Sequence, residues 1–401
     1  MRYAKITNRL AGLGSDKWAL RIASIRRQKA GLPVIDLTIG EPDITTPEQL
    51  IDTASQAMRA GRTGYSNGRG ETVLRKALAA HYTLMLGRDI GTDRFLCLPG
   101  TQTSLFLAFM ALCEAGDEVV LADPMYASYE ALIRAPGAVP VPVRLHPEAG
   151  FRLAAEDVAR AITPATRVLF LNTPHNPTGA VLSPDDLGAL CELAEAHDLW
   201  IISDEVYGLL THGETVFTSA LADPAHEGRV IAAASISKSH AAPGFRAGWL
   251  CAPAEFCDRA LALSESMLFG TQPFIADMAA QALTAPDQSP APAMAARMAR
   301  RASIIHAALD GVAGLRVHRP QAGMFALIDI RALCGDSERF ALALLDGAGV
   351  AVMPGASFGA GLEGWLRVAL NAPDDETARA CELIADFARS WDGASSVAHT
   401  A

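Results

Sequence analysis

Residues 235–249 read Ser-Ile-Ser-Lys-Ser-His-Ala-Ala-Pro-Gly-Phe-Arg-Ala-Gly-Trp, and they place Lys238 directly after an apolar run at residues 230–234. A buried ammonium group is costly unless it is paired or neutralised. A neutral or imine-linked lysine avoids this cost, and desolvation lowers the pKa of its amine toward the nucleophilic form. Ser235 and Arg246 offer a hydroxyl and a guanidinium to one phosphate group. The spacing alone leaves a surface lysine beside an unrelated arginine as an equal alternative.

Short apolar runs alternate with helical patterns from about residue 94 onward. Such near-continuous runs are typical of strands covered on both faces, and their alternation with helices predicts an α/β fold with a mainly parallel sheet between helices. Polar residues at the strand ends, such as Asp204 and Ser235, then lie where these sheets bind ligands. The predicted strands are residues 95–98, 118–122, 139–143, 168–172, 200–204, 230–235 and 247–251. The predicted helices are residues 104–114, 129–135, 156–162 and 185–197.

The pattern changes after residue 285, where a proline-rich stretch interrupts the chain. The chain beyond this stretch predicts a smaller α+β domain, because strand and helix patterns no longer alternate regularly. We expect the last ten residues, which are rich in small and polar types, to form a loose tail. The elements predicted here are a long helix to about residue 309, strands at 324–328, 350–353 and 365–370, and a helix at 375–390.

The composition of the chain indicates which cellular compartment and which binding partners to expect. The 401-residue chain carries 34 Lys and Arg against 44 Asp and Glu, a formal net charge of −10, which argues against nucleic acid and against anionic membranes as partners. Its seven cysteines include no Cys-x-x-Cys pair, so we predict buried free thiols in a reducing compartment and no metal site. No signal segment and no run of 18 apolar residues is present, so we expect a cytoplasmic protein.

Three further segments accompany the lysine. Asn176-Pro177-Thr178-Gly179 follows one predicted strand, and Asp204-Glu205-Val206-Tyr207 follows the next. Pro99-Gly100-Thr101-Gln102 joins a strand to a helix whose free N–H groups can hold an anion. Each segment has an ordinary alternative: a turn at Asn176, a helix N-cap at Asp204, and a simple strand–helix turn at Pro99.

In this order and spacing, these segments resemble the class I and II aminotransferases, which are pyridoxal 5′-phosphate (PLP) enzymes of fold type I. The resemblance extends from Ile39-Gly40-Glu41-Pro42-Asp43 to the final helix and looks closest to a bacterial branch of arginine–pyruvate transaminases and broad aspartate aminotransferases. It implies a large PLP-binding domain at residues 46–285 and a small domain built from residues 1–45 and 286–401. It also implies a homodimer whose active sites are shared between the subunits.

The resemblance implies a role for each matching residue around the cofactor ring. Lys238, the catalytic residue, would form a Schiff base with PLP and carry a proton between the substrate and the cofactor. Asp204 would pair with the pyridine nitrogen, and Tyr207 and Asn176 would hydrogen-bond the phenolic oxygen. Tyr126 would stack on the ring, although a loop aromatic packed on the core is its alternative.

The cofactor phosphate has its own set of implied contacts. Ser235, Arg246 and the backbone amides of Thr101 and Gln102 would hold it. Tyr65 matches the tyrosine that the family sends across the dimer to the partner's phosphate, and a plain surface-turn tyrosine is its alternative.

Substrate binding is implied for three residues. Arg367 lies within an apolar run and would bind the substrate carboxylate through both arms of its fork, unless it lies on an exposed edge strand. Asn176 would also contact the substrate, and Gly40 would give a close-packed backbone position beside the carboxylate.

The predicted activity is transfer of the amino group of an L-amino acid to a 2-oxo acid, pyruvate or 2-oxoglutarate, by a ping-pong mechanism. Met267 falls where one subgroup of aspartate enzymes places a second arginine, which weakens the prediction of a dicarboxylic donor. Glu265 would favour a cationic donor, or it is a solvated acid on a helix. The alternatives are a PLP-dependent lyase, such as a carbon–sulfur β-lyase, and, less favoured, a non-catalytic PLP-sensing module.

Overall fold

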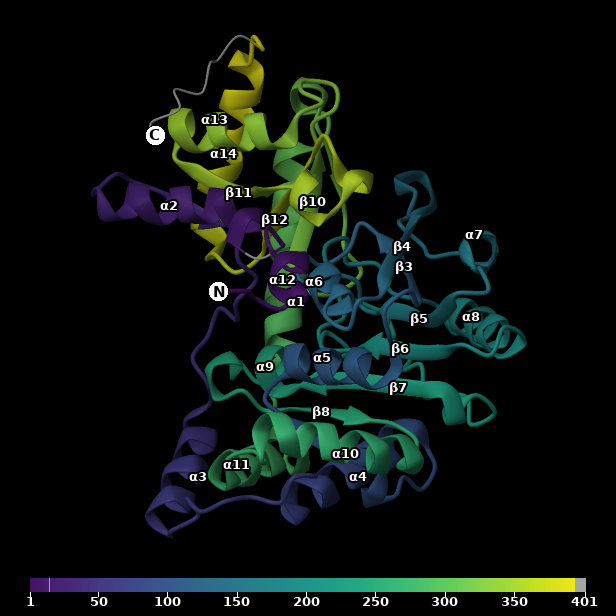
Figure 1. Ribbon diagram of the computed structural model, residues 1–401. Coiled ribbons are helices and arrows are strands. Elements are labelled where there is room, and N and C mark those ends of the chain that lie inside the picture. The colour runs from purple at the N-terminus through teal and green to yellow at the C-terminus, as the bar shows by residue number, and fades with distance from the viewer. Residues whose placement is uncertain (14, 394–401) are drawn as a thin grey trace.

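The computed structural model describes residues 1–13 and 15–393 and contains two β-sheets, a seven-stranded sheet in the lower part of Figure 1 and a five-stranded sheet above it. The long helix α12 (Ala291–Leu309) runs between them. The part of the expected C-terminal tail from residue 394 onward lies outside the described residues.

The seven-stranded sheet has the order β2-β8-β7-β6-β5-β3-β4. Only β8 runs against the other strands, so the prediction of a mainly parallel sheet is confirmed. β4 lies at one edge, where Pro140 and Pro142 cost few hydrogen bonds because one side of the strand has no neighbour. The strands are β2 (Phe95–Leu98), β3 (Glu118–Asp123), β4 (Val139–Arg144), β5 (Thr166–Asn172), β6 (Trp200–Asp204), β7 (Val230–Ser235) and β8 (Gly248–Cys251).

Helices bury both faces of this sheet, because alternate strand residues point to opposite sides. Val168 and Phe170 pack with one core cluster, and Leu169 and Leu171 pack with another. The first cluster includes residues of α5 (Thr101–Leu112), α6 (Tyr129–Arg134) and α10 (Ala254–Leu268). The second includes residues of α3 (Glu48–Arg59), α4 (Thr72–Leu86), α7 (Ala155–Ala161), α8 (Pro184–Ala196) and α11 (Pro273–Thr284).

The smaller sheet has the order β1-β11-β12-β10-β9 and is antiparallel apart from the β1–β11 pair, in which the N-terminal strand joins the C-terminal part of the chain. The fold class predicted from the sequence is confirmed, whereas the domain limits at residues 45/46 and 285/286 stay a prediction. The strands are β1 (Ile35–Leu37), β9 (Arg316–His318), β10 (Phe325–Asp329), β11 (Val350–Pro354) and β12 (Trp365–Ala369). The neighbouring helices are α2 (Ala19–Lys29), α12, α13 (Ser337–Ala348) and α14 (Asp374–Ser390).

Two local signals set helix limits near the site. Ser183 and Asp186 form a reciprocal capping box at the start of α8, close to the predicted start at residue 185. The helix predicted at 104–114 instead begins at Thr101. Gly100, with a left-handed φ of 84°, completes the turn after β2, so the helix can start at the next residue. This earlier start places Thr101 and Gln102 at the N-terminus of α5.

The cysteines lie mostly in the core: all seven are free, and all but Cys334 are buried. Within residues 1–13 and 15–393, we find no helix with the length and apolarity needed to cross a lipid bilayer.

Candidate active site

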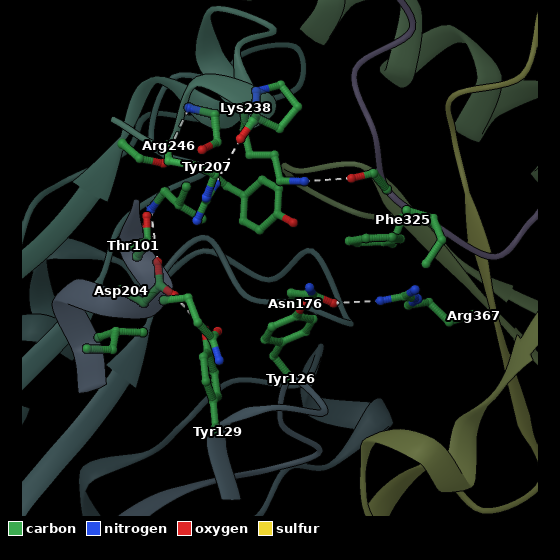
Figure 2. Close-up of a pocket in the computed structure, with 18 of the residues that line it drawn as sticks. Thr101, Tyr126, Tyr129, Asn176, Asp204, Tyr207, Lys238, Arg246, Phe325 and Arg367 are labelled. Carbon is green, nitrogen blue, oxygen red and sulfur yellow. Dashed lines mark hydrogen bonds between the residues drawn. The ribbon is translucent and has the colours of Figure 1, made fainter. Parts of the chain in front are cut away.

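A pocket of about 230 Å³ opens at the carboxyl ends of the parallel strands and is closed on its other side by residues of the smaller sheet (Figure 2). Such strand ends are where open α/β sheets bind ligands. Eleven of the twelve predicted site residues line it: Gly40, Thr101, Gln102, Tyr126, Asn176, Asp204, Tyr207, Ser235, Lys238, Arg246 and Arg367.

Lys238 lies on α9 (Ile236–Ser239), a single helical turn that directly follows β7. Its Nζ points into the pocket and donates a hydrogen bond of 2.6 Å to the carbonyl oxygen of Gly40 (Figure 2). Burial is the main cause that lowers the pKa of the Lys238 amine to about 8, with Arg367 and Arg246 acting in the same direction and Glu41 in the opposite one. A substantial fraction of this amine is therefore neutral, and nucleophilic, near physiological pH.

This lowered pKa predicts a distinctive labelling profile. In protein without a bound ligand, the rate of Lys238 acetylation by a short pulse of acetic anhydride should rise with a midpoint near pH 8. Mass spectrometry of the Lys238 peptide gives the rate, and an unstructured lysine peptide, with a midpoint near 10.4, is the reference. A Lys238 midpoint above about 9.5 would contradict the buried environment described here.

Asp204 ends β6 and is buried at the floor of the pocket. The hydroxyl of Tyr129 donates to Oδ2 at 2.8 Å, and the amide of Val206 donates to Oδ1 at 3.1 Å. Burial raises the pKa of this carboxyl to about 6, against the influence of these hydrogen bonds and of Lys238, so it is mainly ionised at neutral pH. The alternative of a helix N-cap is wrong, because a turn at residues 206–209 follows Asp204.

Asn176 and Tyr207 come from the loops that follow β5 and β6. Asn172, the last residue of β5, fixes the first loop: its Oδ1 accepts from the Asn176 amide at 2.8 Å, and its Nδ2 donates to the carbonyl of Asp204 at 3.1 Å. Burial raises the pKa of the Tyr207 phenol well above its usual value, and a hydrogen bond with Asn176 opposes this. Both side chains therefore face the same polar part of the pocket.

A cradle for an anion lies at the N-terminus of α5. This twelve-residue helix has no side-chain cap, and the buried Thr101 Oγ1 has no hydrogen-bond partner within the described chain. The guanidinium of Arg246 closes over the turn, since a Cβ at Gly100 would lie 2.2 Å from its Nη2. Ser235 also lines the pocket. An uncapped helix end, a hydroxyl without a partner and an arginine together match the needs of a phosphate group.

Arg367 lies in the middle of β12 and is 1% exposed, although no carboxylate of the described residues pairs with it. Its Nη2 donates to the Thr38 carbonyl at 2.6 Å, and its Nη1 donates to Asn176 Oδ1 at 3.2 Å. The guanidinium carbon lies 3.8 Å from the ring centre of Phe325 and 4.3 Å from that of Phe358. The buried Nε has no partner among the described residues. β12 lies between β11 and β10, so the alternative of an exposed edge strand is wrong.

This environment is unfavourable for an isolated cation. Burial lowers the pKa of Arg367 to about 10, which leaves it charged at neutral pH. A buried arginine without a counter-ion is stabilised by a ligand that brings a carboxylate. Figure 2 shows Lys238 and Arg367 on different sides of the pocket, with the Asn176 side chain hydrogen-bonded to Arg367.

Several lining residues were missed in the sequence. Tyr129 stands at the start of a predicted helix, three residues after Tyr126, and this short aromatic spacing was a usable signal. Phe325 belongs to an apolar strand and could not be distinguished from core. Trp18 lies in the N-terminal segment, where it meets Tyr126 edge-on at 6.4 Å, and no local pattern marks it.

Tyr65 is the one predicted site residue that lies outside the pocket. It is 91% exposed and packs edge-on against Phe269, with ring centres 4.9 Å apart. A single chain therefore leaves open both its predicted role across a dimer and its alternative as a surface-turn residue.

Comparisons with known proteins show the family of this chain. The chain matches the family Aminotransferase class I and II over residues 33–384. It is 40% identical to an arginine–pyruvate transaminase of Pseudomonas aeruginosa over 386 residues, which cover 96% of this chain and 98% of that protein. It is 35% identical to an aspartate/prephenate aminotransferase of Thermus thermophilus over 370 residues, which cover 92% and 94%.

Solved structures give the same result. The aspartate aminotransferase from Thermus thermophilus with maleate has a TM-score of 0.89 and 31% identity, covering 96% of this chain and all of that one. The aspartate aminotransferase from Rhizobium meliloti has a TM-score of 0.90 and 28% identity, covering 97% of this chain and 99% of that one. The predicted family is thereby confirmed: this chain belongs to the class I and II aminotransferases, enzymes that move an amino group between an amino acid and a 2-oxo acid.

Proposed function

We propose that this aminotransferase binds PLP in the described pocket, covalently at Lys238, and uses it to transfer amino groups by a ping-pong mechanism. The observation that carries the proposal is the pair of cationic positions without acidic partners among the described residues: the cradle at Thr101 and Arg246, and the buried guanidinium of Arg367. The first suits the phosphate of the cofactor, and the second suits the carboxylate of the substrate.

The donors around the pocket fit the rest of the cofactor. PLP, when bound, supplies an electron sink that lowers the cost of removing the α-proton of an amino acid. Asp204 offers the negative charge that keeps a pyridine nitrogen protonated, and Tyr129 and the buried surroundings hold that carboxylate in place. Tyr207, Asn176 and Tyr126 line the same pocket. Tyr207 and Asn176 would hydrogen-bond the phenolic oxygen, and Tyr126 would stack on the face of the ring.

The chain's own residues then divide the work on the substrate. Arg367 would bind the carboxylate through its fork, and its stacking on Phe325 and Phe358 holds the guanidinium plane rigid. Lys238, with an amine pKa lowered to about 8, would take the proton from the α-carbon of the substrate and return it to C4′ of the cofactor. Because the amino acid and the 2-oxo acid both carry a carboxylate, the two half-reactions can use Arg367 in turn.

The choice of amino donor follows from the charges that line the pocket. Among the described lining residues the cations are Lys238, Arg246 and Arg367, and each already has a proposed role. Met267 does not line the pocket and is 37% exposed. A second carboxylate on the donor thus finds no free cation among the described residues of this pocket. We therefore propose a donor with a neutral or cationic side chain, such as arginine, and pyruvate or 2-oxoglutarate as acceptor.

The purified protein allows a direct test by a spectral half-reaction. Single amino acids (arginine, alanine, aspartate) are added without any oxo acid while the visible band of bound PLP is followed. The proposal predicts conversion to the pyridoxamine form, reversed by pyruvate or 2-oxoglutarate, with arginine or alanine faster than aspartate. A band that never converts with these donors, while a donor with a leaving group on its β-carbon, such as cystathionine, releases pyruvate and ammonia, would contradict it and would instead indicate a lyase.

We also propose a homodimer in which Tyr65 completes the partner's cradle, which its exposure and its place outside its own pocket support. The free cysteines support a reducing compartment such as the cytoplasm.

Shared sites predict complementation between two defective chains. Tyr65→Ala should weaken PLP binding about 10-fold, the effect of losing one hydrogen bond to a charged group. Tyr65→Ala and Lys238→Ala chains, each poorly active alone at limiting PLP, should recover about a quarter of wild-type activity when co-expressed, because half of the dimers are hybrids with one complete site. A monomer in sedimentation, or no gain above the separate variants, would contradict this arrangement.

A further inference from the structure

One short backbone segment contacts both key side chains of the pocket. Residues 38–40 follow β1, and the Gly40 carbonyl accepts from Lys238 Nζ while the Thr38 carbonyl accepts from Arg367 Nη2, both at 2.6 Å. Gly40 also lies against the ring of Phe325, because a Cβ there would come within 2.3 Å of it. That ring stacks on Arg367. The position of residues 38–40 therefore affects the lysine and the arginine together.

The upstream end of this segment is fixed by Asp36. Its carboxylate accepts from Ser24 Oγ at 2.6 Å, from the Thr38 amide at 3.0 Å and from the Thr38 hydroxyl at 2.5 Å, and it pairs with Arg21. These contacts are local and hold the start of the segment to α2.

The downstream end is fixed over a long sequence distance by Asp43. Its carboxylate accepts two hydrogen bonds from Arg297, at 2.7 and 2.9 Å, and one from Arg301 Nη1 at 2.8 Å. The Asp43 and Arg301 side chains are 5% and 6% exposed, and that of Arg297 is 26% exposed. Both arginines lie on α12, so this buried cluster ties the segment to the long helix between the sheets.

Arg301 extends the same cluster to the strand that carries Arg367. Its Nη1 also donates to the carbonyl of Leu370, at 2.9 Å, and its Nε pairs with Asp374 at 3.1 Å. Leu370 directly follows β12. The Arg301 guanidinium is therefore bonded both to Asp43, just beyond the segment that contacts Lys238, and to the end of the strand that carries Arg367.

We propose that Asp43, Arg297 and Arg301 are positioning residues that set residues 38–40 against Lys238 and Arg367, and thereby control binding of the substrate carboxylate. A buried ion cluster adds little stability compared with apolar packing, so its fixed geometry is the property that a function can use. The inference rests on the proposed function, in which Arg367 binds that carboxylate. The three residues touch neither substrate nor cofactor and act through the backbone of the segment.

The test replaces Asp43 with asparagine, which keeps the shape of the side chain and removes its charge. We expect the KM values for the amino donor and for the oxo acid each to rise about 10-fold, with kcat within about threefold of wild type. The dissociation constant of propionate, an unreactive carboxylate followed through the visible band, should rise by the same factor. Arg297→Lys, at the least buried position, should raise both KM values about threefold because it keeps the charge but loses the fork.

A matched control separates positioning from stability. Glu227 also joins two arginines, Arg88 and Arg94, but it lies in the turn before β7, at the opposite end of the strand from Lys238. Glu227→Gln should lower the thermal midpoint as Asp43→Asn does and leave KM and propionate affinity unchanged. Unchanged KM and propionate affinity in both Asp43→Asn and Arg297→Lys, or equal changes in Glu227→Gln, would overturn the positioning role. A wild-type protein without a visible band or half-reaction would instead refute the proposed function.

Discussion

Replacing Lys238 with alanine should lower the rate of transamination by about 10⁴-fold or more, because no other group among the described pocket residues is placed to carry the α-proton. Asp204 lies on the pocket floor, Tyr207 has a phenol pKa raised well above its usual value, and Arg367 stays protonated. Steady-state kinetics with saturating PLP and the visible spectrum of the purified variant measure the loss. The absorbance of covalently held PLP should be absent as well.

Two further variants test whether the loss of activity comes from losing the proton-carrying amine of Lys238. Lys238→Arg keeps the positive charge but cannot lose a proton in water, so it should be as inactive as the alanine variant. Lys76→Ala, on the exposed face of α4, removes a lysine far from the pocket and should retain full activity. Retention of more than about one hundredth of wild-type activity by Lys238→Ala would show that another base performs the transfer.

Arg367→Gln should reduce kcat/KM for amino acids and for oxo acids by about 10²-fold, which corresponds to about 3 kcal/mol for losing a buried charged contact with the carboxylate. The loss should depend on the carboxylate itself: in wild type alanine should be preferred strongly over ethylamine as amino donor, and in the variant most of this preference should disappear. The thermal midpoint should not fall, because the buried guanidinium has no counter-ion among the described residues of the free protein.

Arg331→Gln is the matched control for this variant. Arg331 follows β10 of the same sheet and also lies over an aromatic ring, that of Trp365, at 5.2 Å, but it is exposed and lies outside the pocket. It should leave kcat/KM unchanged. An Arg367→Gln enzyme that keeps its preference for alanine would place the carboxylate site elsewhere.

Part of the fold could be predicted from the sequence, because the patterns that mark those strands and helices lie within a few neighbouring residues. Val168 to Leu171 form an unbroken apolar run, and the structure buries these residues on both faces of the sheet. The reversed direction of β8 carries no such signal, because an apolar strand has the same composition whichever way it runs. The exact start of α5 depended on the left-handed backbone of Gly100, which the predicted start at residue 104 overlooked.

The site likewise contains residues that a local sequence pattern marks and residues that no such pattern marks. Lys238, Asp204 and Asn176 stand in recognisable segments beside strand ends, and the fold brings these ends together. Arg297 and Arg301 carry no local mark, since they sit in a helix with several other arginines, and their partner Asp43 is more than 250 residues away. Only the packing of α12 against the N-terminal segment brings them to the residues that border the pocket.

The most direct test of the central claim is to locate the cofactor on the chain. The protein is incubated with PLP, reduced with sodium borohydride, digested and analysed by mass spectrometry. The structure predicts one stable adduct, on the peptide that contains Lys238, and its loss after Lys238→Ala. An adduct on a different lysine, or none on the wild-type protein, would contradict the assignment of this pocket as the PLP site.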